Sequence, residues 1–285
     1  MVARVARRNQ GRCRRFGAYI RAGAGLGLAA RLVPKHGEAS GPTRTDRGNG
    51  LRKLGMIGGL SWVSTALYYE QINKGVNRRL GGVASAPLAV ESVDFGHFSA
   101  LQHEGRWGEA AEILAEAARR LEASGAGALI LCSNSCHKVY DEVAAAVAVP
   151  ILHIGDITAA RLTADGVKRA GLIGTRFTMS EGFYRERLEA HGIEISVPDP
   201  GMAQEIDRII FEELVRGQVS RISQRTLKTC LTVMGQARNQ AVILGCTELV
   251  MLVDPGGSVI PTYDTTAIHA QAAIEWILDD GPPDA

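Results

Sequence analysis

The chain has 285 residues, of which 46% are apolar and 5% aromatic, and its formal net charge is +2. This composition suits one or two α/β domains with a sizeable aliphatic core. No uninterrupted apolar run approaches the roughly 18 residues of a membrane span, so we expect no membrane partner.

Positive charge is concentrated at the amino end. Residues 1–50 contain eleven Lys and Arg against two acids, which leaves 21 basic and 28 acidic side chains in the remainder. Such a mildly acidic body gives no reason to expect nucleic acid as a partner. The extension has no sustained periodicity, so we expect a disordered tail or a start codon placed too far upstream. An organelle transit peptide is the alternative.

The five cysteines form an odd, irregular set, and three of them lie in or next to apolar, strand-like runs. Such a set does not resemble the disulfide framework of a small secreted domain. We therefore expect reduced thiols and a cytoplasmic protein.

Ordered structure is predicted to begin at Leu51. Residues 54–59 form a predicted strand that ends in a glycine turn, and Ser61 is well placed to cap a helix over 63–79. In chain order, a buried strand over 87–93, a helix over 108–124, a strand over 128–131, a helix over 138–147, a strand over 149–154 and a helix over 156–164 follow.

The pattern then restarts. Ala170-Gly171-Leu172-Ile173-Gly174-Thr175 repeats Leu54-Gly55-Met56-Ile57-Gly58-Gly59 at an offset of 116. The predicted elements are a strand over 193–197, helices over 203–216 and 221–240, strands over 241–244 and 259–263, and a last helix over 265–278. Repeated strand–helix alternation predicts an α/β fold of two pseudo-symmetric lobes, each a parallel sheet flanked by helices. We divide the body into residues 52–155 plus 262–285 and residues 156–261.

Two matching strand ends carry the reactive side chains. Gly245-Cys246-Thr247-Glu248 ends one strand, and at an offset of 113 Cys246 aligns with Ser133. Ligands of such sheets bind beyond the carboxyl ends of the strands, so both side chains are expected to face one cleft. A buried cysteine is most often a small hydrophobe. At this strand end, the following helix is expected to lower the thiol pKa and make Cys246 an acid or base.

Other candidate sites have weaker signals. The turn at Gly58-Gly59 lacks the spacing of dinucleotide or P-loop sites, although its backbone N–H groups could hold a small carboxylate. Cys132, Cys136 and His137 fit no standard zinc spacing, so we expect no metal. His153 and His269 could orient a catalytic group or be structural histidines.

The chain resembles the aspartate/glutamate racemase superfamily, close to its broad-specificity amino-acid racemase branch. The motifs that carry this resemblance run in order from about residue 52 to 280 and include Gly58-Gly59-Leu60-Ser61-Trp62, Ser92-Val93-Asp94-Phe95, Cys132-Ser133-Asn134-Ser135-Cys136-His137-Lys138, Gly174-Thr175-Arg176-Phe177-Thr178, Ile210-Phe211-Glu212-Glu213-Leu214 and Gly245-Cys246-Thr247-Glu248.

The resemblance implies an active site between two lobes, no pyridoxal cofactor, a small acidic amino acid as substrate and a possible homodimer. It also implies two cysteines that remove and return the α-proton on opposite faces of the substrate. Cys246 matches the second of them, whereas Ser133 stands in place of the first. The residues expected to hold the substrate are Gly59, Ser61, Asn134, Ser135, Thr175, Thr178, Thr247 and Glu248.

We therefore expect a cofactor-independent racemase of the aspartate/glutamate type, with Cys246 and Ser133 as its catalytic residues. Because a serine hydroxyl is a much weaker acid than a thiol, two alternatives stay open. One is a single-thiol asymmetric decarboxylase or cis–trans isomerase of small diacids. The other is a catalytically impaired protein that only binds an acidic amino acid.

Overall fold

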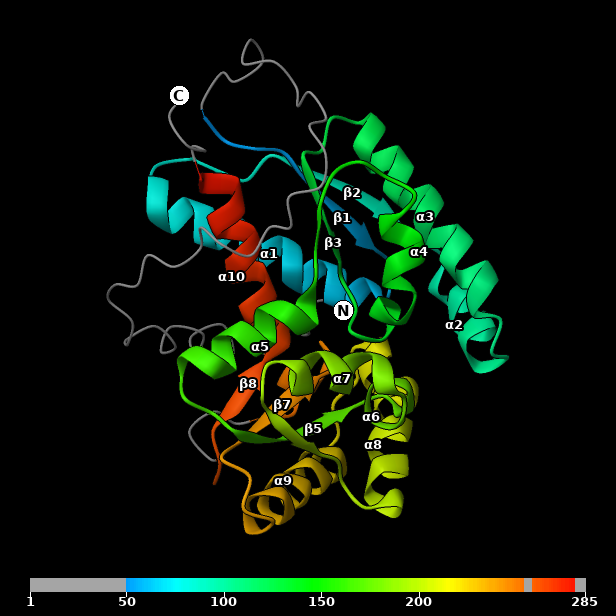
Figure 1. Ribbon diagram of the computed structural model, residues 1–285, viewed down its shortest axis with the longest axis vertical. Helices are drawn as coiled ribbons and strands as arrows, with labels where there is room; N and C mark the ends of the chain where they lie inside the picture. Colours follow the sequence, from blue (N-terminus) through cyan, green and yellow to red (C-terminus); the bar gives the residue numbers. More distant parts are fainter. Residues whose placement is uncertain (1–49, 254–257, 280–285) are drawn as a thin grey trace, which may run out of the picture. The chain divides into compact units, whose positions relative to one another are not determined.

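The computed structural model describes residues 50–253 and 258–279 of the chain. These residues form two four-stranded sheets, both entirely parallel and both flanked by helices (Figure 1). The predicted α/β fold is therefore confirmed. The expectations for the basic extension, including Cys13, lie outside the described residues apart from Gly50.

The first sheet has the strand order β2-β1-β3-β4. Its strands are β1 (Leu54–Gly58), β2 (Leu88–Ser92), β3 (Ala128–Leu131) and β4 (Ile151–Leu152). Every residue of β1 and β3 is buried, as expected for central strands covered on both faces. One face packs against α2 (Phe95–His103), α3 (Trp107–Ala123) and α4 (Tyr140–Ala144), and the other against α1 (Trp62–Leu80) and α10 (Thr265–Leu278).

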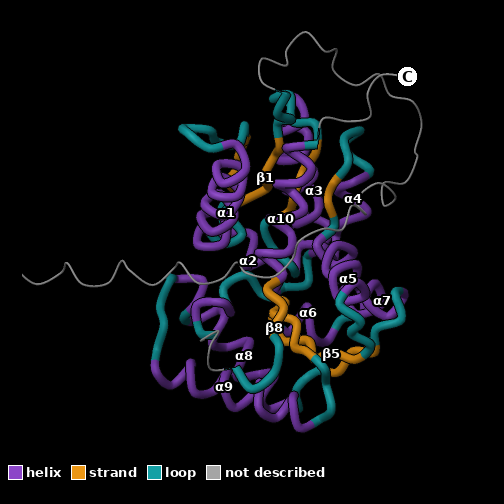
Figure 2. The backbone as a smooth tube through the Cα atoms, turned by 90° about the vertical axis from the view of Figure 1, so that its left-hand side faces the viewer, coloured by secondary structure: helices purple, strands orange, loops and turns teal. Residues whose placement is uncertain are grey.

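The second sheet repeats this topology in the order β6-β5-β7-β8. Its strands are β5 (Arg169–Gly174), β6 (Glu194–Ser196), β7 (Ala241–Gly245) and β8 (Thr262–Asp264). Helices α8 (Pro200–Glu212) and α9 (Arg221–Gln236) cover one face, and α5 (Ile154–Ala164) and α7 (Gly182–Ala190) cover the other. Figure 2 shows the two groups of strands separately. The identical strand orders account for the repeat seen in the sequence.

Several predicted elements are shorter than expected or differ in kind. Strand β2 lies at a sheet edge and is half-buried, where a buried strand was predicted. The helix predicted over 138–147 is a 3₁₀ turn, η3 (Ser135–Val139), followed by the five-residue α4. Strand β4 has two residues, and α9 ends four residues before Gln240.

Helix α2 was not predicted. The carboxylate of Asp94 accepts a hydrogen bond of 2.9 Å from the backbone N–H of Gly96 and so caps this helix. Phe98 and Leu101, one turn apart, bury its inner face. In the sequence, the Asp cap and the spacing of Phe98 and Leu101 were the signals that could have predicted this helix.

A positive backbone angle fixes the turn that follows β1. Gly59 has φ +77°, and a Cβ atom there would lie 2.3 Å from the carbonyl oxygen of Val93. Only glycine combines this conformation with so close an approach. The turn thereby directs the chain into α1 beside the carboxyl ends of β1 and β2.

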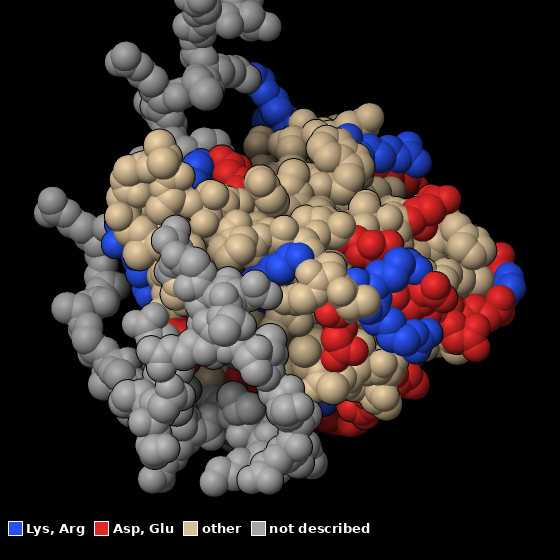
Figure 3. Space-filling view, turned by 90° about the horizontal axis from the view of Figure 1, so that it is seen from above, with Lys and Arg blue, Asp and Glu red and all other residues tan. Residues whose placement is uncertain are grey.

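The lobe boundaries stay a prediction at the residue level. Strand β8, next to the proposed boundary at 262, pairs with β7 of the second sheet, whereas α10 packs against α1 of the first. Within the described ranges, no helix is both long and apolar enough to cross a membrane. Acidic and basic side chains are interspersed on the face in Figure 3, and many pair at the surface, as Arg106 does with Glu109.

Candidate active site

A pocket lies beyond the carboxyl ends of strands from both sheets. Its lining includes residues one or two positions past the ends of β1, β3, β5 and β7, together with side chains from α2, which follows β2, from α8 and from the 3₁₀ turn η4 (Leu214–Arg216). Ligands of parallel sheets bind at such strand ends. The lining residues are Leu60, Phe95, Gln102, Ser133, Asn134, Ser135, Thr175, Ile210, Phe211, Val215, Gly245, Cys246, Thr247 and Glu248.

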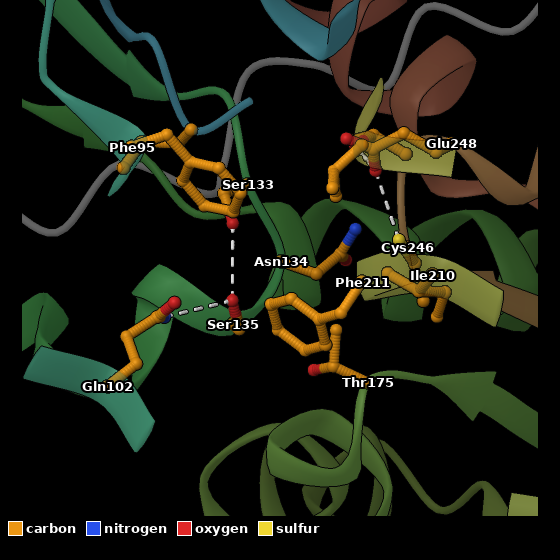
Figure 4. A pocket seen from close by; sticks show the side chains of 14 residues that line it. Phe95, Gln102, Ser133, Asn134, Ser135, Thr175, Ile210, Phe211, Cys246 and Glu248 are labelled. Carbon is orange, nitrogen blue, oxygen red and sulfur yellow. Dashed lines mark hydrogen bonds between the residues drawn. The ribbon is translucent and has the colours of Figure 1, made fainter. Parts of the chain in front are cut away.

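Cys246 and Ser133 both line this pocket. In the view of Figure 4 the side chain of Asn134 lies between them. Five of the predicted binding residues, Asn134, Ser135, Thr175, Thr247 and Glu248, also line it. The other three lie behind the wall.

The three residues behind the wall make supporting contacts. The N–H of Gly59 donates to the hydroxyl of Thr65 at 2.8 Å. The hydroxyl of Thr178, fully buried, lies 3.3 Å from that of Thr175. Ser61 precedes α1, but its side chain makes no capping hydrogen bond and donates instead to Glu248, so the predicted cap is wrong.

The carboxylate of Glu248 joins the two halves of the site. It is 3% exposed. One of its oxygens accepts hydrogen bonds from Ser61 at 2.5 Å and Ser64 at 2.7 Å, both of the first half. The other accepts from the Cys246 thiol at 3.0 Å and from Thr247 at 2.6 Å. Four donors therefore satisfy the two oxygens of this buried carboxylate.

The thiol of Cys246 differs from the sequence-based expectation. Burial raises its pKa well above the ordinary value, and the charge and hydrogen bond of Glu248 raise it further. The backbone N–H groups of Glu248 and Leu249 act in the expected opposite direction. They belong to the start of a three-residue 3₁₀ turn, η5 (Leu249–Met251), rather than to a long helix. A full helix dipole is therefore missing, and the expected lowering of the pKa is wrong.

Ser133 has polar neighbours of a different kind. Its hydroxyl lies 3.3 Å from that of Ser135, which accepts a hydrogen bond from Gln102 at 3.4 Å. Cys132 is fully buried and packs with residues of α1 and α10, on the opposite face of the strand from the pocket. Cys136 packs in the other core, where burial raises its pKa to about 12.

Asn134 has an unpaired acceptor in the pocket. Its amide N–H donates to the hydroxyl of Thr265 at 3.0 Å, while its oxygen Oδ1 is buried without a hydrogen-bond partner among the described residues. Buried polar atoms of this kind are rare in folded proteins. A bound ammonium group would satisfy it.

His137, His153 and His269 meet in one buried cluster behind Ser133. The ring centroids of His137 and His153 are 4.5 Å apart, and those of His137 and His269 are 6.1 Å apart. Each ring makes a structural hydrogen bond. His137 donates to the carbonyl of Ser133, His153 accepts at the start of α5, and His269 donates to the carbonyl of Leu152.

We expect this cluster to make the protein acid-labile. Burial lowers the pKa of His137 to about 3 and of His269 to about 4, and it also lowers the pKa of His153. The unfolded chain therefore binds more protons than the folded one below about pH 6.5, and stability falls as the pH drops through that value. Three such groups give a slope approaching ~4 kcal/mol per pH unit near pH 5.

Denaturant unfolding at a series of pH values measures this slope. In His269→Gln, which cannot take up a proton at this position, the slope should fall by about one third. A free energy of unfolding that is flat between pH 7 and 5 would contradict the prediction.

The structure also adds residues that sequence reasoning did not assign to the site. Ser64 contacts both Glu248 and Thr247. Its position three residues after Ser61, on the same face of α1, was the available signal. The apolar lining residues Ile210, Phe211 and Val215 come from α8 and η4, and no strand-end signal marks them. In the parts of the chain described, no group of three or more His, Cys, Asp or Glu is arranged to hold a metal ion.

Comparison with known proteins finds relatives in the family that the sequence motifs resemble. The model of the Asp/Glu/Hydantoin racemase family matches residues 57–273. A candidate Asp/Glu racemase from Yersinia pestis is similar in structure with a TM-score of 0.74 and 43% identity, covering 80% of this chain and all of that one. For an aspartate racemase homologue from Pyrococcus horikoshii OT3, the TM-score is 0.69 and the identity 32%, with the same coverage.

A curated relative extends this similarity. The broad specificity amino-acid racemase RacX of Bacillus subtilis is 26% identical over 170 residues, which are 60% of this chain and 73% of that protein. The resemblance drawn from the motifs is thus confirmed. With its two parallel sheets and a family match over residues 57–273, the chain belongs to the Asp/Glu/hydantoin racemase family.

Proposed function

We propose that the protein is an amino-acid racemase that works without a pyridoxal cofactor, through Cys246 on one side of the substrate and Ser133 on the other. The observation that carries this proposal is the pocket itself. Equivalent strand ends of the two repeated sheets bring a thiol and a hydroxyl into its lining. Mirror-image substrates and products call for acid/base groups on two sides.

Each half of the reaction uses groups already in place. Glu248 accepts the thiol hydrogen bond of Cys246 and is positioned to take its proton, which leaves a thiolate as the base for the α-proton. Ser133 then gives its hydroxyl proton to the opposite face of the substrate. A proton from solvent, relayed through Ser135 at 3.3 Å, restores the Ser133 hydroxyl, and Glu248 releases to solvent the proton that it took from Cys246. The unpaired Oδ1 of Asn134 accepts from the substrate ammonium.

The substrate carboxylate has neutral partners in this proposal. The hydroxyls of Ser135, Thr175 and Thr247 line the pocket, while Gly59, Ser61 and Thr178 support the walls from behind. The resemblance implies aspartate or glutamate as the substrate, so both acids belong in the first assay. A cytoplasmic location, a homodimer and the division into lobes at 155–156 and 261–262 stay predictions.

The test is chiral chromatography of amino acids incubated with the purified protein. Formation of the second enantiomer from the first supports the proposal. Carbon dioxide release from a malonate, or isomerisation of maleate, without amino-acid turnover would favour the single-thiol alternative. Thermal stabilisation by an amino acid with no chemistry would favour the binding protein.

Replacing Ser133 by cysteine should give the two sides of the substrate acid/base groups of similar strength. A thiol is a far stronger acid than an alcohol, so Ser133→Cys is expected to raise the racemisation rate by about tenfold or more. The matched variant Ser133→Ala should lose racemisation and keep α-proton exchange on the Cys246 side. Equal racemisation by wild type and Ser133→Ala would show that Ser133 takes no part.

A further inference from the structure

The pocket offers a substrate a single full charge, and that charge is negative. Among the described residues that line it, Glu248 is the one charged side chain, with no Lys, Arg or His. The hydrogen bonds to its carboxylate come from hydroxyl and thiol groups. The site can therefore balance one positive group of a substrate.

The nearest basic side chains along the chain face elsewhere. Arg176 follows Thr175, yet it is exposed and its guanidinium carbon lies 4.1 Å from the centre of the Phe177 ring. Lys138 pairs with Glu181 on a neighbouring element. Arg216 follows Val215 and is exposed, outside the lining. A second substrate carboxylate would thus enter the pocket without a cation.

The rest of the wall suits an uncharged side chain. Five apolar residues line it, namely Leu60, Phe95, Ile210, Phe211 and Val215. Figure 4 shows the side chains of Phe95, Ile210 and Phe211 around the same pocket as those of Ser133, Thr175 and Cys246. An apolar wall lowers the cost of burying carbon and raises the cost of burying an unpaired charge.

We infer that the site selects α-amino acids with an uncharged side chain over aspartate and glutamate. This inference rests on the proposed racemase function and departs from the acidic substrate that the resemblance implies. The ammonium of a neutral amino acid balances Glu248, and its α-carboxylate uses the hydroxyls of Ser135, Thr175 and Thr247. An acidic side chain would add an unpaired charge near that of Glu248. A basic one would need a second acid, which the lining does not contain.

Isosteric pairs test this directly. Asparagine matches aspartate and glutamine matches glutamate in shape, so each pair differs mainly in charge. We expect kcat/KM for α-proton exchange in heavy water to be about tenfold or more higher for each amide than for its acid. Lysine should exchange as poorly as the acids. Faster exchange of either acid, or of lysine, would overturn the inference.

A variant removes the difference in intrinsic reactivity between acid and amide. Val215 is half-buried in the lining, so a lysine there can direct its ammonium into the pocket. Val215→Lys should raise the ratio of aspartate to asparagine exchange by about tenfold, whereas Val215→Met should leave it unchanged. An unchanged ratio in a folded Val215→Lys protein would count against the inference.

Binding separates this inference from the proposed function. Ligand-dependent shifts of the melting temperature can be measured for the same four compounds without turnover. Larger shifts with the amides and no exchange would refute the racemase while the selectivity stands. Larger shifts with the acids would refute the selectivity whether or not exchange occurs.

Discussion

Cys246→Ser is expected to reduce the racemisation rate by about 10³-fold. The hydroxyl keeps the size of the group and its hydrogen bond to Glu248, but it yields its proton far less readily than the thiol. The substrate contacts through Asn134 and Thr247 remain, so ligand binding should change little. Steady-state kinetics and a melting-temperature shift with the substrate give the two readings.

Cys230 supplies the matched control. It is 1% exposed and packs in the same hydrophobic cluster as Cys246, but it lies on α9 and outside the pocket lining. Cys230→Ser therefore imposes a similar change on the same core. Its kcat/KM should stay near that of the wild type. An equal loss of activity in both variants would mean that core packing, not acid/base chemistry, explains the effect.

Glu248→Gln is expected to lower kcat/KM by about 100-fold and to move the pH dependence of the reaction. The amide cannot take the thiol proton. Its NH₂ group would also face hydroxyl groups that donate to the carboxylate in the wild type, and an NH₂ group cannot accept those hydrogen bonds. Removing the charge also removes a cause of the raised pKa of Cys246. The rising limb of the pH–rate profile, which reports the ionisation of the Cys246 thiol, should therefore shift to lower pH.

That shift distinguishes a chemical role from a structural one. A merely destabilised variant would lose activity at every pH with the same profile. Ser64→Ala removes one hydrogen bond to Glu248 and keeps the charge, so it should reduce activity less and leave the limb in place. If the rising limb of the pH–rate profile has the same position in Glu248→Gln as in the wild type, the carboxylate does not set the pKa of the Cys246 thiol.

The sequence predicted the parts of the site that depend on strand order. The repeat at offsets of 113 and 116 placed Ser133 and Cys246 at equivalent carboxyl ends of strands in the two sheets, where ligands of parallel sheets bind, and both residues line one pocket. The hydrogen bond between Ser61 and Glu248 spans 187 residues, and no local pattern announces it. Local reasoning therefore assigned Ser61 to a cap that its side chain does not make.

Electrostatics was the hardest property to predict. The backbone N–H groups at the end of β7 act on Cys246 in the expected direction, but burial and Glu248 outweigh them. The burial of Cys246 and the environment of Glu248 depend on how the two halves of the protein pack, not on the residues next to them in the sequence. The apolar wall of Ile210, Phe211 and Val215 was missed for the same reason, since helix periodicity marks a buried face without saying which cavity it borders.

The central claim is that proton transfer is two-sided and unequal, and isotope exchange tests it most directly. In heavy water, loss of the α-proton is followed by NMR and inversion by chiral chromatography, starting from each enantiomer separately. The enantiomer whose proton faces Cys246 should exchange about tenfold or more faster than it inverts, because the thiol returns a solvent deuteron before Ser133 can. The other enantiomer should exchange only as fast as it inverts. Exchange and inversion at equal rates from both enantiomers would contradict the account.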